Sequence, residues 1–563
     1  MNDKIFNPHR RYICVNKENT LLEVSHLSVA FGGHTVVDDV SYTLQQGRTL
    51  GIVGESGSGK SVSTLALMGL LPKNASISGS AMLDGAELLT LDEEGFRGIR
   101  GKRISMIFQE PMTSLNPVHK CGAQVVEMLQ QHESISDKEA RERIIALFNE
   151  VLLPRPEKIF DSYPHEISGG QKQRVMIAMA LVNNPDILIA DEPTTALDVT
   201  VQKTILNLLR QLQEKHGTSI IFITHDLGVI AQVADDIMVM YRGKVVEHGS
   251  AKQILHSPQE PYTQGLLACR PPLDSKPRRL PTVEEYLEGV KENDANVPSL
   301  PLTPSHSISL LSVENLDVTY TLKRSIFGHP LQTLKGIDDI SFDIMEGETL
   351  GLVGESGCGK STLGRAMLRL IESSAGSVSY RGTPLDKLSA KEMRTLRPKL
   401  QIIFQDPYSS LNPRITIGEA IREPMTVHGG GDRSKVVELM EQVGLKAEWY
   451  SRYPHELSGG QRQRVCIARA LILQPELIVC DESVSALDVS VQAQVLNLLN
   501  DLKEQYHYTY LFITHDLSVV HYMADRIMVM QKGKIVESGT PDDIFHNPKT
   551  DYTRTLIDAI PRI

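Results

Sequence analysis

Two eight-residue runs of the chain have the residue types and spacing of a phosphate-binding loop. They are GESGSGKS at 54–61 and GESGCGKS at 354–361, and each lies between a short apolar segment and a segment with helical spacing. The glycines allow successive backbone N–H groups to face one anion, and the helix behind adds its positive N-terminus. In such a loop the lysine reaches the outer phosphates, and the serine hydroxyl suits Mg²⁺. The sequence therefore predicts two polyphosphate sites, built from Gly54, Gly57, Gly59, Lys60, Ser61, Gly354, Gly357, Gly359, Lys360 and Ser361.

Two other apolar segments end in paired carboxylates. The runs ILIADE and LIVCDE have the composition of buried parallel strands, and an acidic pair at the end of such a strand is costly unless something uses it. Asp191 and Asp481 suit the second shell of Mg²⁺, while Glu192 and Glu482 suit a general base that polarises the attacking water. A salt-bridged pair at a sheet edge is the alternative, and the phosphate-binding loops upstream make it the weaker one.

A third motif, ISGGQKQRV at 167–175 and LSGGQRQRV at 457–465, places serine and two glycines at the start of a predicted helix. Such a start is an anion site, although Ser-Gly-Gly alone is also an ordinary turn and cap. Taken in order, the three motifs resemble those of ATP-binding-cassette ATPases, and the resemblance covers about 21–270 and 309–563. It implies an α/β fold in which each cassette has a RecA-like parallel-sheet core, an antiparallel β subdomain and a helical subdomain.

The resemblance also implies roles for residues outside these motifs. The matching positions are Gln109 and Gln405 in the Q-loop, Asp198 and Asp488 in the D-loop, His225 and His515 as switch histidines, and Phe31 and Tyr320 as the aromatics that stack on adenine. The glutamines would reach the metal and the water and face a membrane partner, while the histidines would contact the γ phosphate. For the two aromatics a place in the core is the alternative, because aromatics commonly end strands.

In this family two cassettes pair head to tail, so that the signature of one covers the ATP held by the other. The resemblance therefore implies one site that joins Lys60 to Ser458, Gly459, Gly460 and Gln461, and another that joins Lys360 to Ser168, Gly169, Gly170 and Gln171. We expect both sites to hydrolyse ATP. Two positions differ between the copies. Val62 replaces Thr362, which removes a side-chain contact to the α phosphate, and Ser483 replaces Pro193 after the catalytic glutamate.

The chain repeats one domain. LLEVSHLSVAF matches LLSVENLDVTY at an offset of 289 residues, and the offset rises to 300 at the loops, so the second copy carries 11 extra residues between Tyr320 and Leu334. We expect them in a hairpin loop. The predicted organisation is a tail at 1–20, ATPase domains at 21–273 and 309–563, and between them a flexible proline-rich linker at 274–308 with a net charge of −2.

Composition excludes several other classes. The 563 residues carry a net charge of −11, which gives no electrostatic footprint for nucleic acid, and no apolar run approaches the length of a membrane span. We expect no signal peptide. The six cysteines are scattered with no CxxC pair, so neither a disulfide framework nor a zinc site is indicated, and a reducing cytoplasm fits best.

Several runs resemble one subgroup, the binding-protein-dependent importers of dipeptides, oligopeptides and nickel. They are FQEPMTSLNP, FQDPYSSLNP, YPHEISGG and YPHELSGG, with the tail markers EPYT and DYT. The resemblance implies ATP and Mg²⁺ as cofactors, a peripheral place on the cytoplasmic face of the inner membrane, two permease subunits that we expect to differ, and an extracytoplasmic binding protein. We expect peptides as cargo, of the dipeptide, oligopeptide, glutathione or peptide-antibiotic class. A nickel importer is one alternative, and a soluble tandem-cassette translation factor is another, which the acidic linker disfavours.

Overall fold

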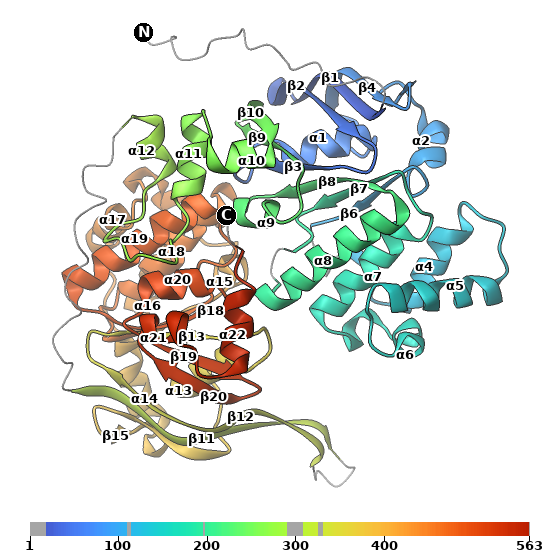
Figure 1. Ribbon diagram of the computed structural model, residues 1–563. Helices are drawn as coiled ribbons and strands as arrows, with labels where there is room; N and C mark the ends of the chain where they lie inside the picture. The colour runs from blue at the N-terminus through green and yellow to red at the C-terminus, as the bar shows by residue number, and fades with distance from the viewer. Residues whose placement is uncertain (1–18, 110–113, 195–196, 290–307, 325–329, 562–563) are drawn as a thin grey trace. The chain divides into compact units, whose positions relative to one another are not determined.

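The computed structural model describes residues 19–109, 114–194, 197–289, 308–324 and 330–561. The chain divides into two compact units (Figure 1). Unit 1 comprises residues 1–193, 207–224 and 232–254, and unit 2 comprises 194–206, 225–231 and 255–563. Each unit contains a six-stranded, mainly parallel sheet and a four-stranded antiparallel sheet, as predicted for an α/β cassette.

In unit 1 the six-stranded sheet has the order β10-β9-β3-β8-β7-β6. Its strands are β3 (Thr49–Val53), β6 (Ile104–Ile107), β7 (Ile187–Asp191), β8 (Ser219–Thr224), β9 (Asp236–Tyr241) and β10 (Lys244–Ser250). The four-stranded sheet, β2-β1-β4-β5, contains β1 (Thr20–Phe31), β2 (His34–Gln45), β4 (Ala75–Leu83) and β5 (Ala86–Glu87). Every residue of β3, β7 and β8 is buried, because helices and the second sheet cover the parallel strands.

The helices of the first copy include those that follow the phosphate-binding loop and the signature motif. They are α1 (Lys60–Leu67), α2 (Glu93–Ile99), α4 (Cys121–Gln130), α5 (Asp137–Glu150), α6 (Pro156–Asp161), η2 (Pro164–Glu166), α7 (Gly169–Leu181), α8 (Val199–His216), α9 (Leu227–Ile230), α10 (Ala251–His256), α11 (Pro261–Ala268) and α12 (Val283–Leu287).

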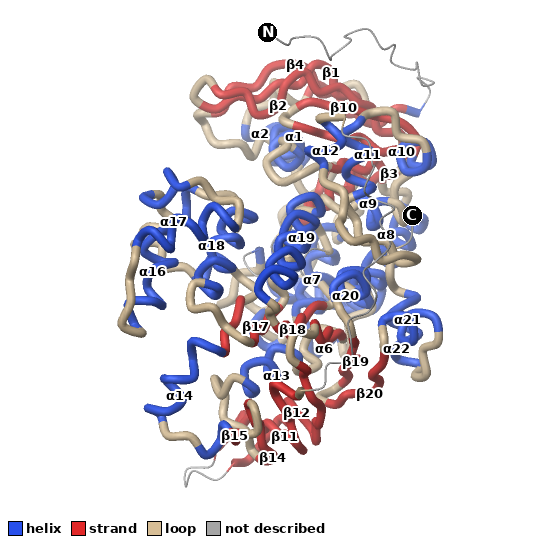
Figure 2. Tube along the Cα trace, turned by 90° about the vertical axis from the view of Figure 1, so that its left-hand side faces the viewer, coloured by secondary structure: helices blue, strands red, loops and turns tan. Residues whose placement is uncertain are grey.

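Unit 2 repeats this plan, with sheet orders β16-β17-β18-β13-β19-β20 and β12-β11-β14-β15. Its strands are β11 (Ser309–Arg324), β12 (Pro330–Met345), β13 (Thr349–Val353), β14 (Ala375–Tyr380), β15 (Thr383–Pro384), β16 (Leu400–Ile403), β17 (Leu477–Asp481), β18 (Thr509–Thr514), β19 (Arg526–Gln531) and β20 (Lys534–Gly539). Its helices are α13 (Lys360–Met367), η3 (Leu385–Lys387), α14 (Ala390–Leu396), η4 (Arg397–Lys399), α15 (Pro407–Ser410), α16 (Ile417–Val427), α17 (Arg433–Gln442), η5 (Ala447–Ser451), η6 (Pro454–Glu456), α18 (Gly459–Leu471), α19 (Val489–Tyr506), α20 (Leu517–Met523), α21 (Pro541–His546) and α22 (Asp551–Asp558). Figure 2 shows the strands of its small sheet at one end of unit 2 and α16, α17 and α18 as a separate helical layer.

The 11 extra residues lie in a hairpin, as predicted, but they lengthen its strands as well as its loop. β11 and β12 have 16 residues each, whereas β1 and β2 have 12. The antiparallel register of the longer pair continues to Arg324 opposite Pro330, and the five residues between them lie outside the described part of the chain. The insertion therefore extends the existing ladder and leaves the core below it unchanged.

The segment predicted as a flexible linker is ordered in its first part. Residues 274–289 belong to unit 2 and include α12, with Leu280 and Val283 buried. Composition indicated an irregular segment because prolines interrupt it, but its few apolar residues bind to a face of unit 2. Residues 255–273, predicted to end the first ATPase domain, also group with unit 2. Residues 290–307 lie outside the described residues.

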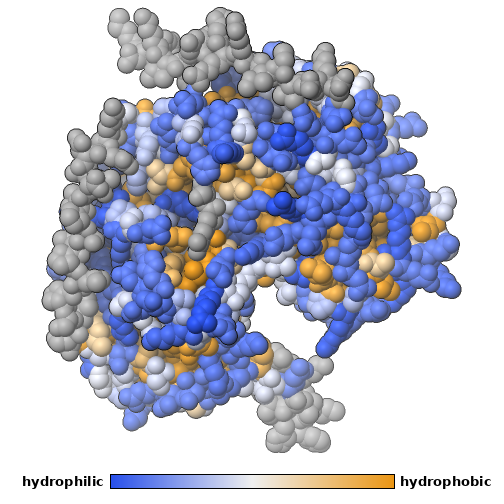
Figure 3. Space-filling model, in the orientation of Figure 1, coloured by the Kyte–Doolittle hydropathy of each residue, from blue (hydrophilic) through white to orange (hydrophobic). Residues whose placement is uncertain are grey.

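Most of the surface visible in Figure 3 is hydrophilic, with small apolar areas between polar ones. Among the described residues, no helix combines the length and the apolar character needed to cross a bilayer.

Candidate nucleotide-binding sites

The two phosphate-binding loops have the backbone that their glycines allow. Gly59 and Gly359 start α1 and α13 with φ of 98° and 111°, in the left-handed region that side chains disfavour. A Cβ atom on Gly54 would lie 2.2 Å from the carbonyl oxygen of Met240. The loops therefore tolerate no side chain at these positions, and the chain passes directly from a buried strand into a helix N-terminus.

The lysine of each loop lies inside the curve that the loop makes. Lys60 is 5% exposed, and its Nζ donates to the carbonyl oxygens of Gly54 and Glu55, each at 2.8 Å. Lys360 makes the same two contacts in its own loop, and its Nζ also lies 3.7 Å from Oε1 of Glu482. The geometry thus places each ammonium group where the loop amides converge.

A serine and an aspartate meet beside each loop. The Ser61 hydroxyl donates to Asp191 Oδ1 at 3.0 Å, and the Ser361 hydroxyl donates to Asp481 Oδ1 at 2.7 Å. Burial raises the pKa of Asp191 to about 6, although the hydrogen bond from Ser61 opposes it, and burial likewise raises the pKa of Asp481. A hydroxyl and a carboxylate provide the oxygen ligands that Mg²⁺ prefers. A bound cation would also stabilise the ionised form of a buried carboxylate. The described residues contain no cluster of three or more His, Cys, Asp or Glu suited to a metal, so phosphate and water oxygens would have to complete the shell.

The predicted general bases have an unusual backbone. Glu192 and Glu482 have φ of 47° and 48°, while their N–H groups still pair with the neighbouring strand, at the carbonyl oxygens of Ile223 and Ile513. A residue other than glycine rarely adopts this conformation, and such positions concentrate at functional sites. The turn directs each carboxylate away from its strand. Sequence patterns do not reveal this feature.

Each Q-loop glutamine contacts its predicted base. Gln109 Nε2 donates to Glu192 Oε2 at 3.1 Å, and Gln405 Nε2 donates to Glu482 Oε2 at 2.8 Å. Between these residues lie 82 and 76 others in the chain, so the sheet topology brings them together: β6 pairs with β7, and β16 pairs with β17. In both copies the Q-loop glutamine and the predicted base therefore lie in direct contact.

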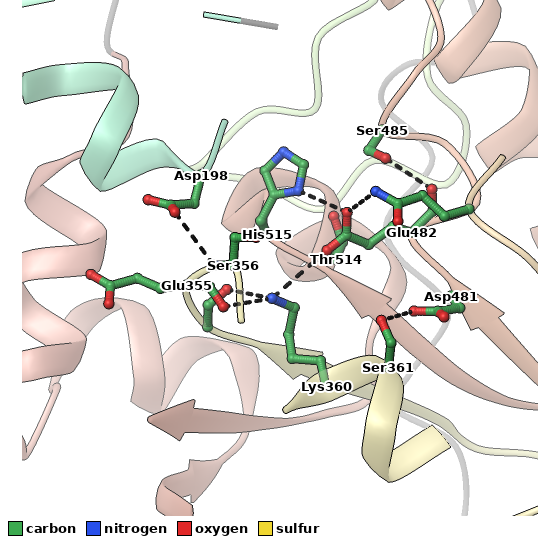
Figure 4. A network of polar contacts seen from close by, with 12 residues as sticks. Asp198, Glu355, Ser356, Lys360, Ser361, Asp481, Glu482, Ser485, Thr514 and His515 are labelled. Atoms are coloured by element: carbon green, nitrogen blue, oxygen red, sulfur yellow. Dashed lines mark hydrogen bonds and ion pairs between the residues drawn. The ribbon is translucent and has the colours of Figure 1, made fainter. Parts of the chain in front are cut away.

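In the second site a histidine also lies beside the predicted base (Figure 4). His515 Nδ1 lies 3.4 Å from Glu482 Oε2. Burial acts to raise the pKa of Glu482, but the hydrogen bond and charge of His515 and the charge of Lys360 outweigh it, so this pKa lies below its ordinary value. The Glu482 carboxylate is thus held ionised, as a base must be. His225 also follows its strand directly, but it groups with unit 2 whereas Glu192 groups with unit 1.

The signature motifs form helix caps. Ser168 caps α7 and Ser458 caps α18, each through a capping box with the glutamine three residues later, Gln171 or Gln461. The box uses the N–H of the third helical residue, while the first two helical positions are glycines, whose amides have no intrahelical acceptor. Both signatures therefore present main-chain N–H groups at a positive helix end, as their sequence predicts.

The D-loop segment of the first copy, within 194–206, groups with unit 2. There the Ser356 N–H donates to Asp198 Oδ2 at 3.4 Å (Figure 4). The Thr200 hydroxyl donates to Glu355 Oε1 at 2.9 Å. Ser356 and Glu355 belong to the second phosphate-binding loop. Asp488, the other D-loop residue, lies at the start of α19.

The two predicted adenine-stacking aromatics have different surroundings. Phe31 ends β1, is partly buried and packs against the core together with Val62. Tyr320 is 37% exposed, and its hydroxyl lies 3.2 Å from Thr362 Oγ1. Thr362 has a hydroxyl that its counterpart Val62 lacks, and in the second site Tyr320 contacts this hydroxyl.

Two features near the sites escaped sequence reasoning. The first is Tyr552, in the tail marker DYT, whose hydroxyl accepts a hydrogen bond from the Glu355 N–H at 3.1 Å. The second ties α15, directly after the Q-loop, to the signature helix. The Arg462 guanidinium lies 3.8 Å from the ring centre of Tyr408, and Arg469 donates to Ser410 O at 2.7 Å and Glu423 Oε2 at 3.0 Å. The repeated motifs gave no signal for these long-range contacts.

Comparisons with known proteins agree with this geometry. A family model described as ABC transporter matches residues 37–195 and 337–485, and one described as the C-terminal region of oligopeptide/dipeptide transporters matches 246–295 and 536–563. The glutathione import ATP-binding protein GsiA of Salmonella typhimurium (strain LT2) is 47% identical over 565 residues, covering 96% of this chain and 89% of that protein. GsiA of Escherichia coli (strain K12) is 46% identical over 561 residues, covering 96% and 89%. GsiA of Pectobacterium atrosepticum is 45% identical over 564 residues, covering 97% and 90%.

Among solved structures, the ATP-binding cassette MJ0796 in a dimeric, post-hydrolysis state bound to ADP and Pi is 27% identical, with a TM-score of 0.38, covering 41% of this chain and 98% of that chain. The family models together match more than half of the chain, and the relatives align along nearly all of it. The chain therefore belongs to the ABC transporter family, as an ATP-binding, ATP-hydrolysing subunit with two fused cassettes from the peptide-importer class.

Proposed function

We propose that this ATPase drives the import of glutathione or a closely similar small peptide. The observation that carries the proposal is the 45–47% identity to proteins named as glutathione import ATP-binding proteins, along both cassettes and their tails. Both cassettes also keep the lysine, aspartate, glutamate and signature of a competent site. Their retention supports an active ATPase rather than a non-catalytic scaffold.

The proposed roles follow from the contacts around each loop. Lys60 and Lys360 hold the outer phosphates, and Ser61 with Asp191, and Ser361 with Asp481, hold Mg²⁺, which when bound neutralises phosphate charge. Glu192 and Glu482 polarise the attacking water. Gln109, Gln405, His225 and His515 orient that water and the glutamates. Figure 4 shows Lys360, Ser361, Asp481, Glu482 and His515 of the second site.

We further propose that the sites are shared crosswise between the cassettes. The contact of Asp198 with the Ser356 N–H supports it, because a D-loop of the first copy then touches the phosphate-binding loop of the second. By the same pairing, the signature at Ser168 serves the site with Lys360, and that at Ser458 serves the site with Lys60. The signature amides would stabilise negative charge that develops on the phosphates.

The proposed assembly contains two membrane permeases, one against each Q-loop region, and an extracytoplasmic binding protein that selects the cargo. The chain would lie at the cytoplasmic face of the membrane. This proposal rests on the importer class of the chain and on the exposed aromatic residues Phe108 and Phe404 beside the Q-loop glutamines.

Uptake of labelled glutathione by cells with and without the gene tests the proposal. Uptake should disappear in the deletion and return with the intact gene, but not with a Lys60→Ala, Lys360→Ala double variant expressed at the same level. Labelled dipeptides and Ni²⁺ serve as the competing cargoes. Normal glutathione uptake in the deletion strain, with loss of dipeptide or Ni²⁺ uptake instead, would assign a different cargo.

A further inference from the structure

The first half of the predicted linker contains a segment that is bound along one face of the second cassette. We call residues 276–288 the strap. Leu280 of the strap is fully buried, and its backbone N–H and C=O both pair with the Asn497 side chain of α19, at 2.9 and 2.8 Å. A side-chain amide that satisfies both groups of one residue acts as a short piece of β-ladder. Asn497 is 2% exposed, so this pairing is shielded from water and costly to break.

Neighbouring groups extend the same contact. The Tyr522 hydroxyl of α20 lies 3.1 Å from Asn497 Oδ1 and 3.3 Å from the carbonyl oxygen of Arg278. Lys276 donates to the carbonyl oxygen of Ala524, the C-cap of α20, at 2.7 Å, where the helix dipole favours a cation. The strap thus satisfies polar groups at the end of α20 as well as along α19.

Charged pairs flank the buried contact. Arg278 lies 3.2 Å from Glu504 and Arg279 lies 3.1 Å from Asp501, and these side chains are about half exposed. Exposed pairs of this kind contribute little free energy, so they align the strap while Leu280, Val283 and Asn497 hold it.

The first cassette lacks part of this recognition surface at the equivalent positions, although Glu214 matches Glu504. At the offset of 290 residues that relates the two signatures, Gln211 replaces Asp501 and Gln232 replaces Tyr522, and the equivalent asparagine, Asn207, is exposed. What differs is the tyrosine, the carboxylate of Asp501 and the burial of the asparagine, and all three of these residues contact the strap. These three features therefore belong to the second cassette specifically.

We propose that the strap is an intramolecular docking peptide that keeps the first cassette bound to the second when no nucleotide joins them. The strap follows residues 255–273, which the sequence predicts as the end of the first ATPase domain and which group with unit 2, while its binding face is formed by α19 and α20. Its contacts involve neither phosphate-binding loop, so they are available in every nucleotide state. The inference concerns the chain itself and does not depend on which cargo is transported.

A protease site placed within residues 290–307 tests this proposal in the full-length protein. Cleavage there leaves the strap on the N-terminal half and its binding face on the C-terminal half. After cleavage and removal of nucleotide with EDTA, the two halves should elute together in gel filtration at micromolar concentration. Separation of the unmodified halves would overturn the proposal.

Two strap variants and one matched control sharpen the result. Leu280→Asp places a charge in the buried position and Asn497→Ala removes both backbone contacts, so each should weaken association of the cleaved halves at least tenfold. Arg279→Ala removes only an exposed ion pair and should leave it within about threefold. Fluorescent ATP analogue binding by the separated halves reports that they are folded. Continued co-elution of both Leu280→Asp and Asn497→Ala halves would overturn the proposal, because other contacts would then join the cassettes.

Discussion

At the scale of single residues, the catalytic assignment rests on two glutamates whose backbone conformation is unfavourable. A residue other than glycine in the left-handed region costs on the order of 1 kcal/mol or more, and both Glu192 and Glu482 adopt it at the same point after a buried strand. The turn places each carboxylate beside a Q-loop glutamine. The contact of each carboxylate with a Q-loop glutamine, in both copies, favours the catalytic role over the sheet-edge alternative.

We therefore predict that Glu192→Gln combined with Glu482→Gln leaves Mg-ATP binding intact but slows hydrolysis at least ~100-fold, the contribution typical of a general base. Steady-state phosphate release and equilibrium binding of a labelled nucleotide measure the two quantities. Glu476→Gln is the control, since Glu476 pairs with Arg381 and Lys399 away from the site. Turnover within a few-fold of the unmodified protein in the double variant would refute the assignment.

Tyr552 leads to a second prediction at this scale. Its hydroxyl accepts from the Glu355 N–H, so the tail of the second cassette supports the phosphate-binding loop. Tyr552→Phe removes one hydrogen bond, and a net value of about 0.5–1.5 kcal/mol corresponds to a roughly three- to tenfold weaker ATP affinity at the second site. Titration in a Lys60→Ala background isolates that site. Tyr506→Phe, which loses an exposed contact to Gln442, is the matched control and should change nothing.

At the scale of elements, α15 and α18 connect the Q-loop of the second cassette to its signature. Arg462 stacks on Tyr408, and Arg469 bonds to Ser410 and Glu423. In the first copy the equivalent positions are Lys172 and Met179. A methionine side chain cannot donate the two hydrogen bonds that Arg469 makes. In the second cassette these contacts connect the segment after the Q-loop to the signature helix.

We predict that Arg469→Met, which introduces the residue of the first copy, loosens α15. Backbone amides of residues 408–411 should exchange hydrogen at least about tenfold faster, because a charged bond to a carbonyl is worth roughly 1.5–3 kcal/mol. Mass spectrometry of the isolated protein measures this exchange. Arg422→Met is the control, since it removes only a pair with Glu419 on α16. Unchanged exchange in Arg469→Met would show that α15 is held by other contacts.

Local motifs predict the strands and helices that carry the chemistry, because an apolar run, a glycine loop and a helix start are contiguous in sequence. The offset between the copies likewise predicts the longer hairpin. The strap and the D-loop contact could not be predicted in this way. Leu280 and Asn497 are 217 positions apart in the sequence. Only the topology of the fold brings such distant residues together. Proline-rich composition predicts a flexible linker, which is wrong for residues 276–288, because composition does not describe the face of the second cassette that binds them.

At the scale of the whole molecule, crosswise sharing makes a prediction about each half. Ser168→Glu adds a negative charge at a helix start that would face phosphate, so it should disable the site with Lys360. Binding at Lys60 should stay largely intact. Photolabelling with azido-ATP, followed by cleavage between the cassettes, assigns the label to each half, and Glu166→Gln nearby is the control. Loss of labelling confined to the Lys60 half would refute head-to-tail pairing.

The surfaces beside the two Q-loops also differ, and this difference bears on the membrane partner. After Gln109 the first copy continues with EPMTSLNPVHKCGAQVVEML, of which residues 110–113 lie outside the described part of the chain. There Val118 is 73% exposed, whereas the second copy exposes Tyr408 by 60% and Val427 by 54%. α16 contains Pro424, and α4 contains no proline. The groups around the phosphate-binding loops, by contrast, are nearly identical in the two copies.

Each cassette must transmit ATP energy to its membrane partner through contacts that change between conformational states. Two different partners therefore require two different contact surfaces, even where the catalytic groups are the same. We therefore predict a permease of two different subunits, one on each cassette. Drift after duplication against a symmetric permease is the competing explanation. Isolation of the complex from native membranes in mild detergent, followed by mass spectrometry of the intact assembly, separates the two. Two distinct permeases in equal amounts would support the prediction, and one permease in two copies would contradict it.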